Sequence, residues 1–234
     1  MIRFALIAAS TLGFLLTAAL GNLMVPLLRA FQSRWDAPQT QQAPEQKAPE
    51  TEPERPAQAP TMGGLCLMVG VLAAVGVGWT AACVAQPELL GAEGLLSVRL
   101  LIALFGALLF GGVGLLDDLA RIRTHSVLGL RRYTRLGLEA AAGAVVLVLL
   151  WAKGCLAAGI TLPGAGYVNL SAAAPLVWEA LLVALAECAR IADGVDGIVC
   201  GTSFAAMLGL MCAMTVLGWF PLGVLPAALA GSLM

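Results

Sequence analysis

The sequence predicts an all-α, polytopic membrane protein with about six to seven transmembrane helices. Of its 234 residues, 60% are apolar and only 12% are charged, which is about half the charged fraction of an ordinary soluble domain. The mean hydropathy is +0.91, and apolar runs of about 18 residues or more recur, each long enough to cross the hydrocarbon core of a bilayer. Because these runs do not alternate between apolar and polar residues, they indicate helices rather than membrane β-strands.

The first apolar run covers residues 4–28. It resembles a signal peptide, but it is too long and lacks a convincing cleavage site, so we expect a first transmembrane helix in residues 1–30. Residues 31–60 are rich in Pro, Gln and Glu and cannot bury enough apolar surface to fold. We expect a flexible cytoplasmic loop there, followed by one transmembrane helical domain in residues 61–234.

The remaining apolar runs predict five further spans, at about 62–85, 99–116, 136–152, 175–192 and 202–220. Residues 222–234 begin what looks like a seventh span and stop before completing it. We therefore expect a truncated chain that is incomplete at its C-terminus. The six cysteines lie mostly in apolar runs without a CxxC pair, so they predict small core residues rather than disulfides or a zinc site.

The distribution of Lys and Arg predicts the orientation in the membrane. With the 29–60 segment inside, the inside segments hold ten of these residues and the outside segments hold three. This asymmetry predicts a multi-pass protein of the plasma membrane with its N-terminus outside. It also places three segments that are far apart in the sequence on one cytoplasmic face. The net charge of −1 indicates no nucleic-acid partner.

Two adjacent carboxylates, Asp117 and Asp118, follow the third span. A charge at mid-membrane costs about 2.5–3.5 kcal/mol on insertion scales, so the end of a span is the place that tolerates one. Successive side chains on a helix diverge by about 100°, so one carboxylate can face a site while the other faces a supporting arginine. The alternative is a plain acidic helix end balanced by Arg121 and Arg123.

The segment ADGVDG places Asp193 before Gly194 and Asp196 before Gly197. Asp-Gly pairs favour turns, and a glycine lets a ligand approach the backbone closely. The spacing excludes an EF-hand loop. The alternative is a turn that breaks a helix at the membrane surface.

The segment GLRRYTRL places Arg131, Arg132 and Arg135 near the start of the fourth span. Arginine forks bind phosphate in a bidentate manner, although the same arginines also fit the positive-inside signal or contact with anionic lipid headgroups. Carboxylates suggest a divalent cation and arginines suggest phosphate. Together they predict phosphoryl-transfer chemistry at the membrane surface.

Three acids lie within or near the spans, and an intramembrane acid is a functional candidate by default. They are Glu139, Glu179 and Glu187. Arg190 lies one helical turn after Glu187, and this spacing predicts an ion pair between them.

Four segments in this order and spacing resemble one family. They are APTMGG (59–64), GLLDDLARI (114–122), LGLRRYTRL (128–136) and ARIADGVDGI (189–198). They are similar to the phospho-N-acetylmuramoyl-pentapeptide transferases (MraY) and to related polyprenyl-phosphate phospho-N-acetylhexosamine transferases. The resemblance implies a ten-helix fold, of which this chain is the N-terminal part, a cytoplasmic-face active site, and a homodimer.

The resemblance also implies the chemistry. In that family a polyprenyl phosphate attacks the β-phosphate of a UDP-sugar, UMP leaves, and Mg²⁺ is required. The residues assigned by resemblance are Asp117 and Asp118 for catalysis, and Arg121, Arg131, Arg132, Arg135, Asp193, Gly194, Asp196 and Gly197 for substrate binding. No metal ligand is assigned, because the family's magnesium-binding asparagine is Arg190 here and a guanidinium has no acceptor with which to ligate a cation.

Three hypotheses follow from these observations. The first is an active transferase of cell-wall peptidoglycan synthesis. The second is a catalytically inactive or truncated relative that binds lipid phosphate or nucleotide. In that case Arg190 occupies the magnesium position and pairs with Asp117, Asp118 or Asp193. The third is a polytopic membrane scaffold without a nucleotide site.

Overall fold

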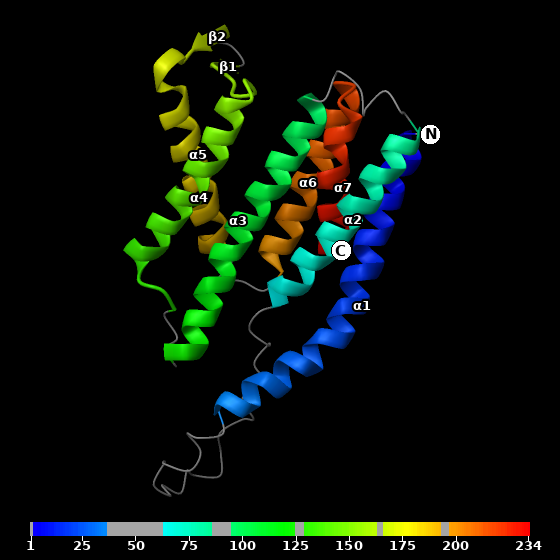
Figure 1. Ribbon diagram of the computed structural model, residues 1–234, viewed down its shortest axis with the longest axis vertical. Coiled ribbons are helices and arrows are strands. Elements are labelled where there is room, and N and C mark those ends of the chain that lie inside the picture. Colours follow the sequence, from blue (N-terminus) through cyan, green and yellow to red (C-terminus); the bar gives the residue numbers. More distant parts are fainter. Residues whose placement is uncertain (1, 37–62, 86–94, 125–128, 163–165, 193–196) are drawn as a thin grey trace, which may run out of the picture.

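The computed structural model describes residues 2–36, 63–85, 95–124, 129–162, 166–192 and 197–234, which are mainly helical (Figure 1). The helices in this part of the chain are α1 (Ile2–Asp36), α2 (Gly63–Ala85), α3 (Leu95–Thr124), α4 (Arg132–Ala152), α5 (Ala174–Ala192), α6 (Ile198–Val216) and α7 (Phe220–Leu233). Helices α1 to α6 are long and apolar enough to cross a membrane, and α7 is a shorter apolar helix. The prediction of an all-α polytopic membrane protein is confirmed.

Several helix ends differ from the predicted span ends. Helix α6, for example, lies four residues earlier at each end than the span predicted at 202–220. Helix α1 continues to Asp36, past the predicted start of the flexible loop at residue 31, and the rest of that loop lies outside the described residues. Helix α3 continues to Thr124, so the aspartate pair lies within a helix and not at its end. The ion pair between Asp117 and Arg121, four residues apart, supports the helix through this polar stretch. Helix α4 begins at Arg132, a turn earlier than predicted.

A small β-hairpin that the sequence analysis did not predict lies between α4 and α5. Strand β1 (Gly159–Leu162) pairs antiparallel with β2 (Gly166–Asn169), and a short 3₁₀ turn (Ser171–Ala173) leads into α5. The strands pair β-branched and aromatic residues, a composition that favours extended structure. The indole of Trp178 on α5 donates a hydrogen bond to the carbonyl of Ala157 (2.9 Å), which fixes the hairpin to the bundle.

The most tightly packed core lies between α1, α2 and α7. Its buried side chains are Leu6 and Ala9 of α1, Val71, Ala74 and Val75 of α2, and Val224, Ala227 and Ala228 of α7. Small residues let these backbones approach closely: a Cβ atom added at Gly231 would collide with the backbone carbonyl of Ser10, and one at Gly13 would lie 2.6 Å from the carbonyl oxygen of Ala228. Such small-residue contacts are typical of helix pairs in membranes, where van der Waals packing drives association.

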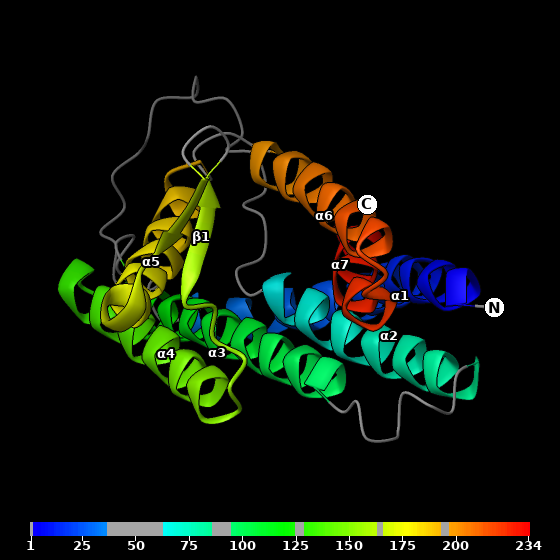
Figure 2. The ribbon, with the colours of Figure 1, turned by 90° about the horizontal axis from the view of Figure 1, so that it is seen from above.

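The other helices extend from this core. Figure 2 shows α4 and α5 on one side of α3, and α1, α6 and α7 on the other. Helix α3 contacts α2, α4 and α7, and α4 contacts α5. All six cysteines are free, as expected, but the prediction that they are core residues holds only for the buried Cys66; Cys188, Cys200 and Cys212 are exposed.

Candidate functional site

One pocket of about 430 Å³ lies between α2, α3, α4 and α5. It is found where α3 and α5 end and α2 and α4 begin, at the lower end of the bundle in Figure 1. Its charged lining residues are Asp117, Asp118 and Arg121 from α3, Arg135 and Glu139 from α4, and Arg190 from α5. The structure therefore brings four of the sequence-predicted site residues, together with the position of the family's magnesium ligand, to one cavity.

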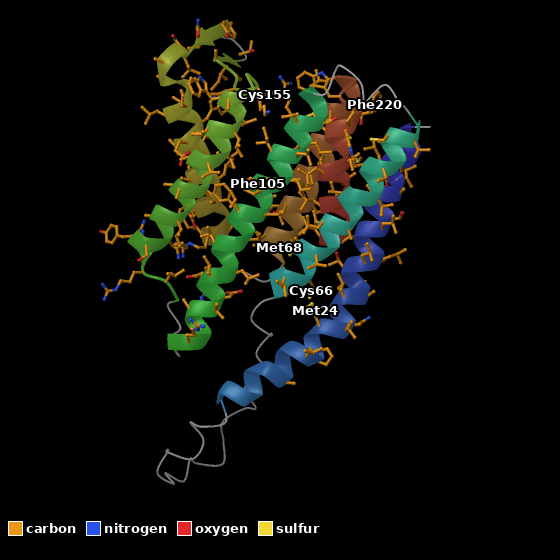
Figure 3. The ribbon with its side chains drawn as sticks, viewed as in Figure 1. Met24, Cys66, Met68, Phe105, Cys155 and Phe220 are labelled. Carbon is orange, nitrogen blue, oxygen red and sulfur yellow. The ribbon has the colours of Figure 1, made fainter. Side chains whose placement is uncertain are left out.

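Apolar side chains form the rest of the wall. They include Leu65 and Met68 of α2 and Phe110 of α3. Met68 lies beside α3 in Figure 3, and a Cβ atom at Gly111 would stand 3.0 Å from its sulfur. A pocket with both apolar and charged walls suits a ligand that combines a hydrocarbon portion with a charged head.

Asp117 is buried, with 6% of its surface exposed, and both of its oxygens are engaged. Its Oδ2 accepts a hydrogen bond from Nη2 of Arg121 at 2.9 Å, and its Oδ1 accepts one from the backbone N–H of Leu130 at 2.8 Å. Gly129 has a φ of +62° and packs so closely that an added Cβ would lie 2.7 Å from Oδ1. Through its hydrogen bond with the Leu130 N–H, Asp117 therefore connects the residues just before α4 to the C-terminal part of α3.

Asp118 has a more open position than Asp117. It lines the same pocket, its side chain is 30% exposed, and its Oδ1 lies 3.9 Å from Nη1 of Arg121. Each carboxylate thus forms an ion pair with the same arginine, but only Asp117 is nearly enclosed. Of the two, Asp118 is the better placed to contact a ligand.

A chain of ion pairs joins α4 to α5 beside the pocket. Arg135, 5% exposed, donates from Nη2 to Oε1 of Glu187 at 3.1 Å, and its Nε lies 3.5 Å from Oε1 of Glu139. Oε2 of Glu187 accepts a hydrogen bond from Nη2 of Arg190 at 2.9 Å. The predicted pair between Glu187 and Arg190 is confirmed. Its extension to Arg135 is new, because the 52-residue separation leaves no local pattern in the sequence.

Three of the remaining predicted site residues are described, and none of them is among the residues that line the pocket. Arg131 and Arg132 are exposed at the start of α4 and are not among the residues that line the pocket. Gly197 precedes α6 with a φ of +82°. The other three residues, Asp193, Gly194 and Asp196, lie outside the described residues.

The magnesium ion that the family resemblance implies can be tested against these side chains. In the described part of the chain, no group of three or more His, Cys, Asp or Glu residues is arranged to hold a metal ion. The carboxylates that line the pocket, those of Asp117, Asp118 and Glu139, are instead paired with guanidinium groups. The described residues therefore do not fit a divalent cation.

Comparison with known proteins identifies relatives. Residues 100–234, more than half of the chain, match the family model described as glycosyl transferase family 4. The phospho-N-acetylmuramoyl-pentapeptide-transferase of Clostridioides difficile (strain 630) is 26% identical over 227 residues, which cover 94% of this chain and 62% of that protein. The protein of the same name from Desulfitobacterium hafniense is 26% identical, over 89% of this chain and 56% of its own length.

A third relative with this name, from Synechococcus sp. (strain JA-3-3Ab), is 33% identical over 83% of this chain and 50% of its own length. The chain thus spans between half and two thirds of the length of these curated relatives. The family model and the relatives agree with the resemblance carried by the four sequence segments. The chain belongs to glycosyl transferase family 4.

Proposed function

We propose that the chain is a membrane phosphotransferase that moves phospho-N-acetylmuramoyl-pentapeptide, or a related phospho-N-acetylhexosamine, from a UDP-sugar to polyprenyl phosphate. The names of its relatives support the reaction class. The single observation that carries the proposal is the pocket in which Asp118 of α3, Arg135 of α4 and Arg190 of α5 meet beside an apolar wall. The arrangement suits two phosphate-bearing substrates, one of which is a lipid.

In this reaction an oxygen of the polyprenyl phosphate attacks the β-phosphorus of the UDP-sugar. The bond from that phosphorus to the oxygen bridging the α- and β-phosphates breaks, UMP leaves, and a lipid-linked sugar diphosphate remains. Both reactants are anions, so cationic groups must offset their repulsion. In the proposed site Arg121 and Arg190 supply positive charge, and Asp118 accepts the proton of the attacking phosphate monoanion. Asp117 is a positioning residue that holds Arg121.

The proposed location follows from the membrane helices. The pocket lies where α3 and α5 end and α2 and α4 begin, and the positive-inside rule supports a cytoplasmic location for that end of the bundle. Under this proposal the protein lies in the plasma membrane and works in peptidoglycan synthesis.

A second candidate is a relative that binds lipid phosphate or nucleotide without turnover. The observation that favours it is the ion pair between Glu187 and Arg190, because Arg190 stands where the family resemblance implies a magnesium-binding asparagine. A site rearranged in this way would keep its affinity for phosphate and lose the metal-assisted step.

Release of UMP separates the two candidates. The purified chain is incubated with UDP-N-acetylmuramoyl-pentapeptide, polyprenyl phosphate and Mg²⁺, alongside Asp118→Asn and Arg123→Gln. Arg123 is an exposed arginine on the same helix, and its variant controls for loss of surface charge. If UMP is released by the wild-type chain and by Arg123→Gln but not by Asp118→Asn, the result supports the transferase. Absence of release together with retained UMP binding supports the second candidate, and absence of both contradicts the proposal.

A further inference from the structure

Among the described residues, acids and arginines alternate in and around the pocket. Four carboxylates and three guanidiniums make up this cluster, which gives it a formal net charge of −1. They are Asp117, Asp118, Glu139 and Glu187, and Arg121, Arg135 and Arg190. Acids gathered this closely repel one another unless cations stand between them, and here arginines stand between them.

Two of the described carboxylates, Asp117 and Glu187, are hydrogen-bonded through both of their oxygens. Asp117 accepts hydrogen bonds through both oxygens, from Arg121 and from the Leu130 N–H. Glu187 also accepts through both oxygens, from Arg135 and Arg190. A divalent cation entering the cluster would have to displace guanidiniums from these oxygens, and each displaced guanidinium would add repulsion of its own.

We propose that Arg121 and Arg190 take the place of a divalent cation in this pocket, so that it holds a phosphate-bearing ligand through guanidinium groups and without metal. Both side chains combine an ion pair with access to solvent, since 41% of Arg121 and 42% of Arg190 is exposed. A guanidinium carries five N–H donors in a fixed fork, so one donor can hold a carboxylate while others meet a phosphate.

Glu187 is the positioning residue in this arrangement. Its two oxygens hold Arg190 of the same helix and Arg135 of α4, so the orientation of Arg190 toward the pocket depends on the contact between α4 and α5. An asparagine at position 187 could not provide this charge. Glu187 therefore orients Arg190 through their ion pair.

The first test measures metal binding alone and does not depend on the proposed function. Mn²⁺ is titrated into the purified full chain in detergent, and free Mn²⁺ is followed by electron paramagnetic resonance, with Mg²⁺ as competitor. We expect no stoichiometric site in the wild-type chain and a gained site, displaced by Mg²⁺, in Arg190→Asn. Arg190→Lys retains the cation and Arg123→Asn retains the pocket, so both should behave as the wild type.

Two results would overturn the inference. One is a wild-type Mn²⁺ site that Mg²⁺ competes for and Asp118→Asn removes. The other is the absence of a metal site in Arg190→Asn, provided that the variant unfolds at the wild-type temperature and is therefore folded.

The second test measures UMP affinity in EDTA and in Mg²⁺, and it rests on the proposed function because it takes the ligand to be a uridine nucleotide. We expect equal affinity of the wild-type chain in both conditions. In EDTA, Arg190→Asn should bind UMP about tenfold more weakly than the wild-type chain does, which is the loss expected for one charge-assisted hydrogen bond. Mg²⁺ should restore part of the UMP affinity of this variant. A wild-type affinity that requires Mg²⁺ overturns the inference. Absence of UMP binding in every condition instead refutes the proposed substrate, and the Mn²⁺ titration then decides the inference.

Discussion

The guanidinium of Arg135 and the carboxylate of Glu187 lie 3.1 Å apart and join the start of α4 to the end of α5. Only 6% of the arginine side chain and 16% of the glutamate side chain is exposed. Because both groups are withdrawn from water, neither can lose its partner without leaving a poorly solvated charge. This ion pair therefore sets the geometry of one wall of the pocket.

Arg135→Gln should destabilise the protein strongly. Removing one partner of a buried ion pair costs about 3–5 kcal/mol, and here both Glu187 and Glu139 would lose a cation. The measurement is the unfolding temperature in detergent, compared with Arg123→Gln, which removes an exposed arginine. Equal unfolding temperatures for the two variants would show that the pair does not form.

The two adjacent aspartates should respond differently to the same change. Asp117→Asn removes the charge that holds Arg121 and weakens the bond from the Leu130 N–H, at a cost of about 1–3 kcal/mol. Asp118→Asn, in the more open position, should leave the unfolding temperature near that of the wild type and abolish UMP release. Thermal unfolding and UMP release on both variants check this; a larger stability loss in Asp118→Asn would reverse the assigned roles.

Gly231→Val should disrupt the packing of α7 against α1. A Cβ atom there would collide with the backbone carbonyl of Ser10, and backbone cannot move aside as a side chain can. Gly209→Val is the matched control, since a Cβ at that helical glycine meets nothing within 4 Å. The unfolding temperature and the monodispersity of the purified variants provide the measurement. If Gly231→Val unfolds at the same temperature as Gly209→Val, α7 and α1 do not pack as closely at Gly231 as the structure shows.

Glu179→Leu should leave the unfolding temperature unchanged or raise it. Both carboxylate oxygens of Glu179 are buried without a hydrogen-bond partner among the described residues, against the Gly143 position of α4. An unpaired acid in a transmembrane helix is unfavourable, so an apolar residue of similar size removes a cost. Glu139→Leu is the comparison: it should destabilise, because Glu139 pairs with Arg135. If the unfolding temperature falls as much in Glu179→Leu as in Glu139→Leu, Glu179 has a partner and the prediction is wrong.

The helices were predictable because hydropathy and length suffice to identify a membrane span. The end of α3 was not predictable from hydropathy, because its continuation to Thr124 is supported by the ion pair between Asp117 and Arg121. Hydropathy treats both of these residues as the end of a span. The hairpin formed by Gly159–Leu162 and Gly166–Asn169 was not predicted, because its strands are too short to show the two-residue alternation of apolar and polar side chains.

The candidate site was predictable where its contacts are local. The spacing of Glu187 and Arg190 predicts their ion pair, and the same rule applied to Arg135 and Glu139 would have found that contact as well. The link from Arg135 to Glu187 crosses 52 residues, so it depends on how α4 packs against α5 and has no trace in a single sequence. Sequence resemblance grouped Arg131 and Arg132 with Arg135, but the helical turn that buries Arg135 leaves the other two exposed.

We propose that the phosphate-bearing substrate binds in the pocket near the end of α3. The most direct test is calorimetric binding of UDP-N-acetylmuramoyl-pentapeptide to the purified chain, to Arg190→Gln and to Arg123→Gln. We expect the wild-type chain and Arg123→Gln to bind with equal affinity, and Arg190→Gln to bind about tenfold more weakly. Equal affinity in all three proteins, or no binding to the wild-type chain, would contradict it.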